Sequence, residues 1–260
     1  MLSSRNARLA AARRLTDRKD RREAGLFLAE GAPAVGAALR AGVVREIFAT
    51  EAAIERHAEL LSGVAVDQIS PKDAAGLSET ITPQGLIAVC RRVDISLAAA
   101  FARRPRLVAV LVEPNDPGNA GAIMRSADAA GSDAVVFAGG ADVYNGKTVR
   151  ASAGSIFHLD VVVDAVVDDV LQAAREAGLA SLATTGAGAS ELDDLADDAG
   201  LTGPTMWLFG NEARGLPEGV LAEADMTVRV PIYGGAESWN LAAAAALCLY
   251  ASARAQRRAR

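Results

Sequence analysis

The first residues that could do chemistry lie in 113–131 (EPNDPGNAGAIMRSADAAG), where a turn leads into a helical pattern. Proline, aspartate and glycine in the turn are typical of a strand-to-helix connection, and Asn119 is expected to cap the helix. An ordinary connection explains these residues and also Gly131 as the end of the helix. It does not explain Arg125, which stands among Ala, Ile and Met on a helix expected to pack against a sheet.

The second cluster is LFGNEARGLPEG, residues 208–219, whose glycines allow a ligand to approach the backbone closely. Glu212 and Arg214 flank the turn and supply charged groups beside that backbone. The alternative interpretation is a surface loop in which these two side chains form a solvated ion pair.

The third cluster is VPIYGGAESWNLAAAAALCLY, residues 230–250. Glycines turn the chain, and Glu237, Ser238 and Asn240 supply polar groups where a helix begins. The alternative is that Ser238 simply caps that helix. The alanine run that follows is typical of a helix packed closely inside the protein or against a partner subunit.

The elements that must position these clusters alternate between strand and helix. Nearly unbroken apolar runs predict strands at 106–113, 133–139, 159–163, 179–185, 205–210 and 226–232. Helical spacing separates them at 120–130, around 147–156, at 166–177 and from about 238 towards the C-terminus. This alternation predicts an α/β domain with a parallel sheet, and ligands of such sheets bind at the carboxyl ends of the strands. The turns around 119, 210 and 238 are therefore expected to converge on one crevice.

The first part of the chain predicts a second, smaller α/β domain. Strands are expected at 25–30, 43–50, 64–69 and 85–90, with helices at 32–41 and 52–61. Residues 94–105 carry few strand or turn signals and end in Arg103, Arg104 and Pro105, which favours a linker.

Basic residues gather at both ends of a chain whose net charge is −5. Residues 1–22 hold eight Lys and Arg against two Asp, and the last ten residues hold four Arg and no acid. This distribution indicates contact with a polyanion at defined places. The alternative is a solvated helix face and a frayed tail.

Several functions are excluded by what the sequence lacks. It has no G-x-G-x-x-G after the first strand of either part and no phosphate-binding loop of the G-x-x-x-x-G-K type. Cys90 and Cys248 lie in apolar runs without metal-ligand spacing, and His57 and His158 are expected to be structural or solvated. The N-terminus lacks the apolar stretch of a signal peptide, and 241–251 falls short of the ~18 residues of a membrane span. We therefore expect a cytoplasmic protein with neither a membrane nor a metal as partner. The residues alone predict an α/β ligand-binding domain with a basic arm, and they do not choose a reaction.

The three clusters, in this order, resemble the motifs of the SpoU/TrmH (SPOUT) family of RNA ribose 2′-O-methyltransferases. The motif N-x-G-A-x-x-R corresponds to Asn119, Gly121, Ala122 and Arg125. The motif F-G-N-E-x-x-G-L corresponds to Phe209, Gly210, Asn211, Glu212, Gly215 and Leu216. The motif I-P-M-x-G…E-S-L-N corresponds to Val230-Pro231-Ile232, Gly234 or Gly235, and Glu237-Ser238-Trp239-Asn240. Trp239 in place of Leu, and Val-Pro-Ile in place of I-P-M, are departures at apolar positions that would contact the cofactor.

The resemblance implies a domain organisation. Residues 1–97 would form the basic arm and RNA substrate-binding domain, 98–105 the linker, and 106–260 the methyltransferase domain. FLAEG (27–31) and TPQGLIAV (82–89) are similar to the family's substrate-binding domain, which is itself similar to small ribosomal RNA-binding proteins. The resemblance further implies a deep trefoil knot near 205–245 and a homodimer whose interface includes the final helix. The basic arm is similar to that of the thiostrepton-resistance branch.

The resemblance also implies the reaction, which is methyl transfer from S-adenosylmethionine to a ribose 2′-hydroxyl of structured RNA, above all large-subunit ribosomal RNA. The residues implied at the reaction centre are Asn119, Arg125, Glu212, Ser238 and Asn240. The residues implied at the cofactor are Thr184, Leu208, Phe209, Gly210, Val230, Ile232, Trp239 and Leu241. The basic residues implied to contact RNA are Arg13, Arg14, Arg18, Lys19, Arg21 and Arg22. Arg125 would either accept the hydroxyl proton, as proposed for the family, or grip the target phosphate.

Four alternatives stay open at this point. The substrate could be transfer RNA, or the methyl acceptor could be a base nitrogen instead of a ribose. The chain could also be an RNA-binding protein without catalysis, although it retains the five reaction-centre residues. An α/β enzyme for a small metabolite is the fourth alternative, and the basic arm is the feature it leaves unexplained.

Overall fold

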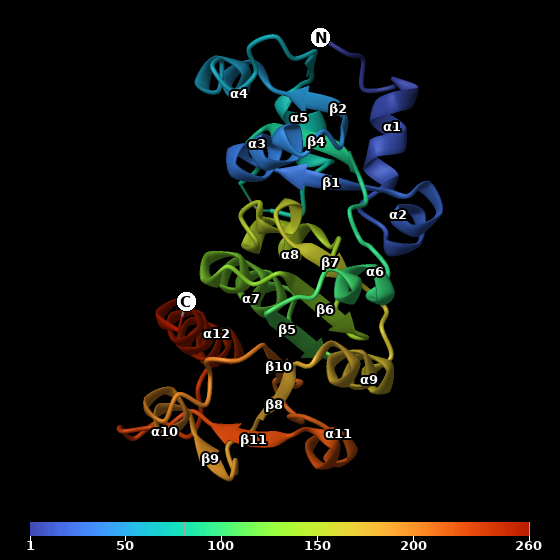
Figure 1. The fold of residues 1–260 in the computed structure, drawn as a ribbon. Coiled ribbons are helices and arrows are strands. Elements are labelled where there is room, and N and C mark those ends of the chain that lie inside the picture. Colours follow the sequence, from blue (N-terminus) through green and yellow to red (C-terminus); the bar gives the residue numbers. More distant parts are fainter. Residues whose placement is uncertain (81, 260) are drawn as a thin grey trace. The chain divides into compact units, whose positions relative to one another are not determined.

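The computed structural model describes residues 1–80 and 82–259, and its internal contacts divide the chain into two α/β units (Figure 1). Unit 1 comprises Met1–Val93 and Asp142–His158, and unit 2 comprises Asp94–Ala141 and Leu159–Arg260. The predicted domain boundaries at 97 and 106 stay a prediction. In the structure, 142–158 packs with the first unit through contacts between residues far apart in the sequence.

Unit 2 contains a sheet of seven strands in the order β7-β6-β5-β10-β8-β11-β9, and every pair of neighbours is parallel. The strands are β5 (Leu107–Val112), β6 (Ala134–Ala138), β7 (Asp160–Val162), β8 (Ala180–Thr184), β9 (Ser190–Glu191), β10 (Thr205–Phe209) and β11 (Met226–Arg229). The chain builds β5, β6 and β7 outwards in one direction and then places β10 beside β5, so the strand order reverses there. In open α/β sheets such a reversal marks the ligand-binding crevice. This parallel sheet and the smaller first unit confirm the predicted fold class, while the knot stays a prediction.

Helices cover both faces of this sheet (Figure 1). They are α6 (Leu97–Ala102), α7 (Pro117–Ala130), α9 (Val167–Ala177), α10 (Leu192–Asp197), α11 (Glu218–Glu223) and α12 (Leu241–Arg258). Contacts group α7 with α12 on one face and α6, α9 and α11 on the other. The central strands β5 and β10 are buried along their whole length, which explains why their sequences are unbroken apolar runs.

Two helix starts differ from the predictions. Asp116 caps α7, because its carboxylate accepts hydrogen bonds from the N–H groups of Gly118 and Asn119, and Asn119 therefore lies inside the first turn. Asn240 caps α12 by accepting from the N–H groups of Ala242 and Ala243. Ser238 lies two residues before that cap, so the interpretation of Ser238 as a simple helix cap is wrong.

Unit 1 contains a four-stranded sheet in the order β1-β4-β2-β3. The strands are β1 (Leu26–Glu30), β2 (Val44–Ala49), β3 (Asp67–Gln68) and β4 (Leu86–Arg91), and β3 is much shorter than the predicted 64–69. The helices are α1 (Ala7–Arg14), α2 (Arg18–Ala24), α3 (Ala32–Arg40), α4 (Glu51–Arg56), α5 (Pro71–Ala75) and α8 (Gly146–Ala151), and a 3-10 turn η1 spans Ser155–Phe157.

The basic arm is a folded part of unit 1. Asn6 caps α1 and Asp17 caps α2, and Leu9, Ala12 and Leu15 are buried in a core cluster that includes residues of β1, β2 and β4. The predicted linker also contains structure, since α6 buries Phe101 in the core of unit 2.

Among residues 1–80 and 82–259, no helix combines the length and the apolar character that a membrane crossing requires. Over the same residues, no group of three or more His, Cys, Asp and Glu side chains is arranged to hold a metal ion.

Candidate functional site

A cavity of about 520 Å³ opens in unit 2 where the strand order reverses. Its walls come from the segments that follow the carboxyl ends of β5, β8 and β10, from β11 and the loop after it, and from the first turn of α12. The lining residues are Asn119, Thr184, Thr185, Gly186, Gly210, Asn211, Glu212, Gly215, Val228, Val230, Ile232, Glu237, Ser238, Trp239, Asn240, Leu241 and Ala244. The structure thus brings the segments around 119, 210 and 238 into one cavity, and its volume is typical of small-molecule sites.

Asn119, Glu212 and Asn240, here called the polar cluster, are joined by hydrogen bonds along one wall of the cavity. The Asn119 amide Nδ2 donates to Glu212 Oε1 at 3.1 Å, and Asn240 Nδ2 donates to Asn119 Oδ1 at 3.2 Å. Each side chain comes from a different sequence cluster. The polar cluster therefore links the turn after β5, the turn after β10 and the start of α12.

The Glu212 carboxylate is also held by backbone groups. Its two oxygens accept hydrogen bonds from the N–H groups of Asn115 at 2.8 Å and Asp116 at 3.0 Å. Desolvation alone would raise the pKa of Glu212, but the hydrogen bonds from Asn115, Asn119 and Asp116 outweigh it, and the pKa lies below its ordinary value. Glu212 is therefore an ionised hydrogen-bond acceptor that fixes the turn, and it is a poor acceptor of a proton.

The turn after β10 is a tight loop closed by two backbone hydrogen bonds between Asn211 and Gly215, at 3.0 and 2.8 Å. A Cβ atom at Gly210 would lie 2.3 Å from the carbonyl carbon of Gly215, so only glycine fits there. Asn211 Nδ2 donates to the carbonyl of Glu113 at 2.8 Å, and Glu113 has a left-handed φ of 48° at the end of β5. The two turns are thus fixed to each other beside the cavity.

Part of the cavity lining is apolar. Val230, Ile232, Trp239 and Leu241 form this part, and the Trp239 indole N–H donates to the carbonyl of Pro231 at 3.1 Å. The Thr184 hydroxyl donates to the carbonyl of Leu208 at 2.8 Å and closes the cavity beside β10. A lining that combines apolar side chains with polar turns suits a ligand with a flat ring system and a polar chain.

Comparison with known proteins identifies the family that has this fold and these motifs. Residues 106–250 match the SpoU rRNA Methylase family. The chain belongs to this family. Residues 6–88 match the MRM3-like substrate binding domain. The family resemblance drawn from the three motifs is thereby confirmed.

Relatives match the chain over nearly its whole length. The 23S rRNA (guanosine(2553)-2′-O)-methyltransferase RlmP of Bacillus subtilis (strain 168) is 35% identical over 253 residues, which cover 95% of this chain and 96% of that protein. A 23S rRNA (uridine(2479)-2′-O)-methyltransferase of Streptomyces viridochromogenes is 34% identical, with 98% and 96% covered. The crystal structure of the SpoU methyltransferase AviRb from Streptomyces viridochromogenes, in complex with the cofactor AdoMet, superposes with a TM-score of 0.80 at 32% identity and covers 98% of this chain and 100% of that one.

Three residues assigned through the SpoU resemblance do not line the cavity. Leu208 and Phe209 are fully buried on the central strand β10, and Leu208 reaches the cavity wall only through its carbonyl bond to Thr184. Arg125 is exposed on α7. The other assigned reaction-centre and cofactor residues all line the cavity.

Five polar or glycine residues of the cavity were not among those assigned, namely Thr185, Gly186, Asn211, Gly215 and Glu237. The signal for the first two was their place at the end of the predicted strand 179–185, because ligands of parallel α/β sheets bind at the carboxyl ends of the strands. Asn211 and Glu237 stand within the motifs themselves. Asn211 holds the loop through its side chain, which also accepts from the N–H of Ala213 at 2.9 Å.

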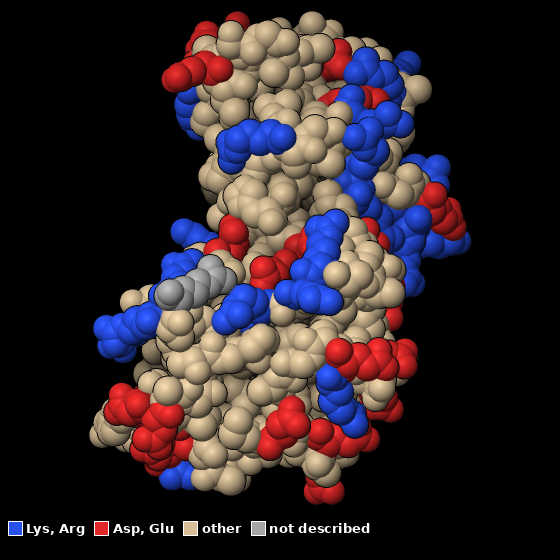
Figure 2. Space-filling view, in the orientation of Figure 1, with Lys and Arg blue, Asp and Glu red and all other residues tan. Residues whose placement is uncertain are grey.

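The six basic residues assigned to RNA contact divide into two groups. Arg14, Arg18, Lys19 and Arg22 are exposed, and Figure 2 shows Lys and Arg side chains gathered over α1 and α2. Arg13 is half-buried and pairs with the buried Asp73 at 2.5 Å. Arg21 is 4% exposed, and we correct its assignment because a buried guanidinium cannot reach an RNA ligand. We call Arg14, Arg18, Lys19 and Arg22 the basic surface.

Proposed function

We propose that this chain transfers the methyl group of S-adenosylmethionine to a ribose 2′-hydroxyl of structured RNA, and specifically of large-subunit ribosomal RNA. The observation that carries the proposal is the meeting of Asn119, Gly210 and Ser238 in one cavity at the strand-order reversal. Relatives matching almost the entire chain are named as 23S rRNA 2′-O-methyltransferases, and one is known with AdoMet bound.

The residues of the cavity fit this methyl donor. Gly210 has no side chain because the backbone of Gly215 occupies that place, so it lines the cavity with backbone groups alone, and the apolar residues Val230, Ile232, Trp239 and Leu241 offer a surface for an adenine ring. Thr184 would close the cavity from β8. When bound, the donor supplies an activated sulfonium methyl, so the chain's own residues need to align an acceptor with it and assist the loss of a proton.

We assign the polar cluster to orientation of the acceptor. Glu212 holds the turn at Asn115 and Asp116, and through Asn119 it fixes Asn240. Ser238 lines the same cavity, and its hydroxyl does not cap α12, because Asn240 fills that role. A rigid set of amide and hydroxyl groups of this kind is suited to holding a ribose in one orientation.

Arg125 has the role of gripping an RNA phosphate in this proposal. Its exposure on α7 leaves the guanidinium open to a ligand outside the cavity. A guanidinium with a pKa above ~12 is a poor base, whereas its planar fork binds phosphate oxygens in pairs. The basic surface on α1 and α2 would bind the RNA backbone at further phosphates.

Three further properties belong to the proposal. Leu247 and Tyr250 on α12 are large apolar side chains exposed to 41% and 67%, which supports a homodimer with α12 in its interface. The trefoil knot and a cytoplasmic location follow from the same family membership. A place in the thiostrepton-resistance branch remains a prediction.

The experiment that tests the function uses purified chain, methyl-labelled S-adenosylmethionine and transcripts of large-subunit ribosomal RNA and transfer RNA. We expect labelled ribosomal RNA in which the linkage after the modified nucleotide resists alkali, because a 2′-O-methyl group removes the attacking hydroxyl. Label with an alkali-sensitive linkage would indicate base methylation, label in transfer RNA alone would change the substrate, and absence of label from every RNA would indicate a binding protein.

A further inference from the structure

The chain passes between the two units at three places: after Val93, after Ala141 and after His158. The middle segment, Asp142–His158, leaves the sheet of unit 2 between β6 and β7 and packs with unit 1. Its first residue is therefore the covalent neighbour of the last residue of a turn in unit 2. On one side of this peptide bond the contacts lead to α2, which carries part of the proposed RNA-binding surface. On the other side they lead to the polar cluster of the proposed methyl transfer site.

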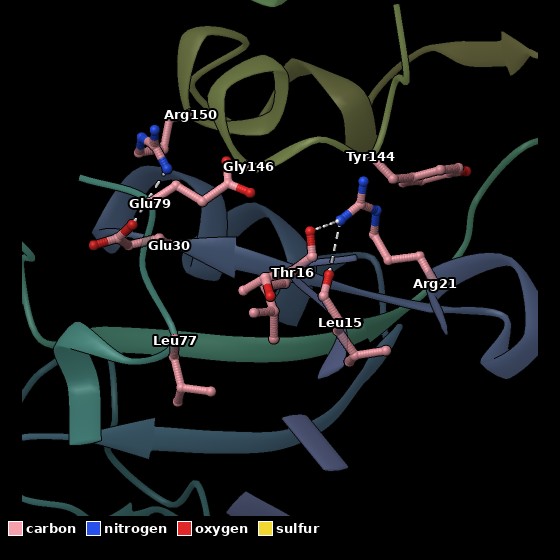
Figure 3. Close-up of a pocket in the computed structure, with 10 residues that line it drawn as sticks. Leu15, Thr16, Arg21, Glu30, Leu77, Glu79, Tyr144, Gly146 and Arg150 are labelled. Atoms are coloured by element: carbon pink, nitrogen blue, oxygen red, sulfur yellow. Dashed lines mark hydrogen bonds and ion pairs between the residues drawn. The ribbon is translucent and has the colours of Figure 1, made fainter. Parts of the chain in front are cut away.

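On the unit 1 side, Asp142 is held by the buried Arg21. Arg21 Nη2 donates to Asp142 Oδ2 at 2.6 Å, and the two side chains are only 5% and 18% exposed. Figure 3 shows the same guanidinium bonded to the carbonyls of Leu15 and Thr16, which join α1 to α2. The other carboxylate oxygen of Asp142 accepts the N–H of Tyr144 at 3.0 Å. Asp142 is thus fixed in position by the two basic helices.

Arg21 and the basic surface share one short helix. Arg18, Lys19 and Arg22 of α2 are exposed, while Arg21 faces inwards and is nearly enclosed. A displacement of α2 by RNA bound at its exposed side would therefore move the guanidinium that holds Asp142.

On the unit 2 side, Ala141 is fixed to the turn that carries the polar cluster. The Ala141 N–H donates to the carbonyl of Pro114 at 2.7 Å. The contact is close, because a Cβ atom at Gly140 would lie 2.5 Å from that same carbonyl oxygen. Asn115, the residue after Pro114, donates its N–H to the Glu212 carboxylate. A shift of Ala141 would therefore reach the carboxylate that orients Asn119.

We infer that Arg21 and Asp142 are positioning residues, which set the turn at 114–116 and hence the polar cluster according to how α2 is held. The inference rests on the proposed methyl transfer and on the proposed RNA contact at α2. It assigns a purpose to a buried arginine that neither RNA binding nor the cavity uses. A buried ion pair contributes little net stability, because the cost of removing both charges from water offsets their attraction. We therefore assign the Arg21–Asp142 pair to holding one backbone geometry.

The test compares Asp142→Asn with a matched control, Glu30→Gln, in otherwise intact protein. Both substitutions remove the charge of a largely buried carboxylate paired with an arginine in unit 1. Glu30 pairs with Arg150 at 3.5 Å (Figure 3). Arg150 belongs to the same segment as Asp142 but is much further from Ala141 along the chain. For each variant the rate constant of methyl transfer is measured in a single turnover with saturating RNA, together with the dissociation constants for RNA and for S-adenosylmethionine.

We expect Asp142→Asn to lower the single-turnover rate constant by roughly tenfold or more, since small misplacements of reacting groups have large kinetic effects. Both dissociation constants should stay within about twofold of wild type, and Glu30→Gln should react at close to the wild-type rate. Arg21→Lys provides a second variant, because lysine keeps the charge but lacks the fork that joins Asp142 to two carbonyls. It should show the same loss of rate at unchanged affinity.

Two results would overturn the inference. One is a folded Asp142→Asn or Arg21→Lys protein with a wild-type rate constant, and the other is an equal loss of rate in Glu30→Gln, which would indicate general destabilisation. If the wild-type chain transfers no methyl group, the proposed function fails and the inference falls with it. An active wild type with unaffected variants refutes the inference alone.

Discussion

The polar cluster and the basic surface both consist of polar side chains, and they differ in how firmly those side chains are held. In the polar cluster every side chain has a fixed partner, so that Glu212 alone accepts three hydrogen bonds from the turn after β5 and from α7. On the basic surface, Arg14 pairs with Asp20 at 2.8 Å and Lys19 pairs with Glu23 at 3.8 Å, but the basic side chains of these pairs are 70% and 80% exposed. Fixed groups can hold one geometry, whereas long exposed side chains adapt to the path of a polyanion.

The difference separates two kinds of experimental effect. Changes in or beside the polar cluster should alter the rate of transfer with little effect on RNA affinity. Changes on the basic surface should alter affinity and its dependence on salt, with little effect on the rate at saturation. The substitutions below test this separation.

Arg125→Ala should have the largest effect, because it removes the group assigned to the phosphate next to the reacting ribose. We expect transfer to fall by about 1000-fold, the upper range for loss of a preorganised charged contact, with unchanged affinity for S-adenosylmethionine. Calorimetry and a single-turnover assay measure the two quantities. Arg175→Ala, an exposed arginine of the same unit paired with Glu223 at 3.1 Å, is the control. Normal transfer by Arg125→Ala would remove this residue from the mechanism.

Glu212→Gln should lower the rate by about 100-fold. A glutamine presents one oxygen to donors that now use two, and its own NH₂ group would face the N–H groups of the turn. The matched control is Glu223→Gln, since that carboxylate is exposed and pairs with Arg175 at 3.1 Å away from the cavity. A rate within twofold of wild type would show that the polar cluster does not position the acceptor.

Replacing Arg18, Lys19 and Arg22 together by alanine should weaken RNA binding by about tenfold at moderate salt. Each phosphate contact that is lost should reduce the slope of log affinity against log salt by about 0.7–0.9. Filter binding over a series of salt concentrations measures this slope. Point substitutions are needed because deletion of 1–22 would also remove Leu9, Ala12 and Leu15 from the core. An unchanged slope would mean that the basic surface does not touch RNA.

Asp73→Asn should have the smallest effect, and it separates the basic residues that serve the fold from those that serve RNA. A side-chain hydrogen bond from Ser70 lowers the pKa of Asp73; burial opposes the change, and Ser4 and Arg13 add to the lowering. A carboxylate whose pKa in the folded state lies below its unfolded value of ~3.9 stabilises the folded protein at pH values above the unfolded pKa. This contribution is lost as the pH falls through the folded-state pKa. We therefore expect a loss of roughly 1–3 kcal/mol in unfolding free energy at pH 7, measured by urea denaturation. An equally large loss of unfolding free energy in Asp73→Asn well below pH 3 would contradict the role of the ionised Asp73 carboxylate in stabilising the fold.

The sequence was informative wherever local spacing decides structure. Apolar runs predicted six strands of unit 2 to within a few residues and missed the short β9, and the three motifs predicted that Asn119, Gly210 and Ser238 would meet. The helix caps show a narrower limit. Asp116 and Asn119 both suit a cap, and the proline between them, at the first helical position, was the signal that favours Asp116.

What the sequence could not predict depends on partners far along the chain. Arg21 stands in a run of basic residues and is distinguished from them only by Asp142, 121 residues away. The packing of 142–158 with unit 1 has the same cause, since Tyr144 stacks on Phe27 with ring centroids 4.6 Å apart. Leu208 and Phe209 were assigned to the cofactor from their motif, but they lie on a central strand of a sheet with helices on both faces, so both side chains are buried in the core.

The central claim is that the turns around 119, 210 and 238 enclose one site for S-adenosylmethionine. Calorimetric titration of the donor into wild-type protein and into Ala244→Phe tests it, because Ala244 lines the cavity from the first turn of α12 and a phenyl ring there would project into it. The account predicts one donor bound per chain in the wild type and none in the variant. Absence of binding to the wild type, or equal binding to both proteins, would contradict it.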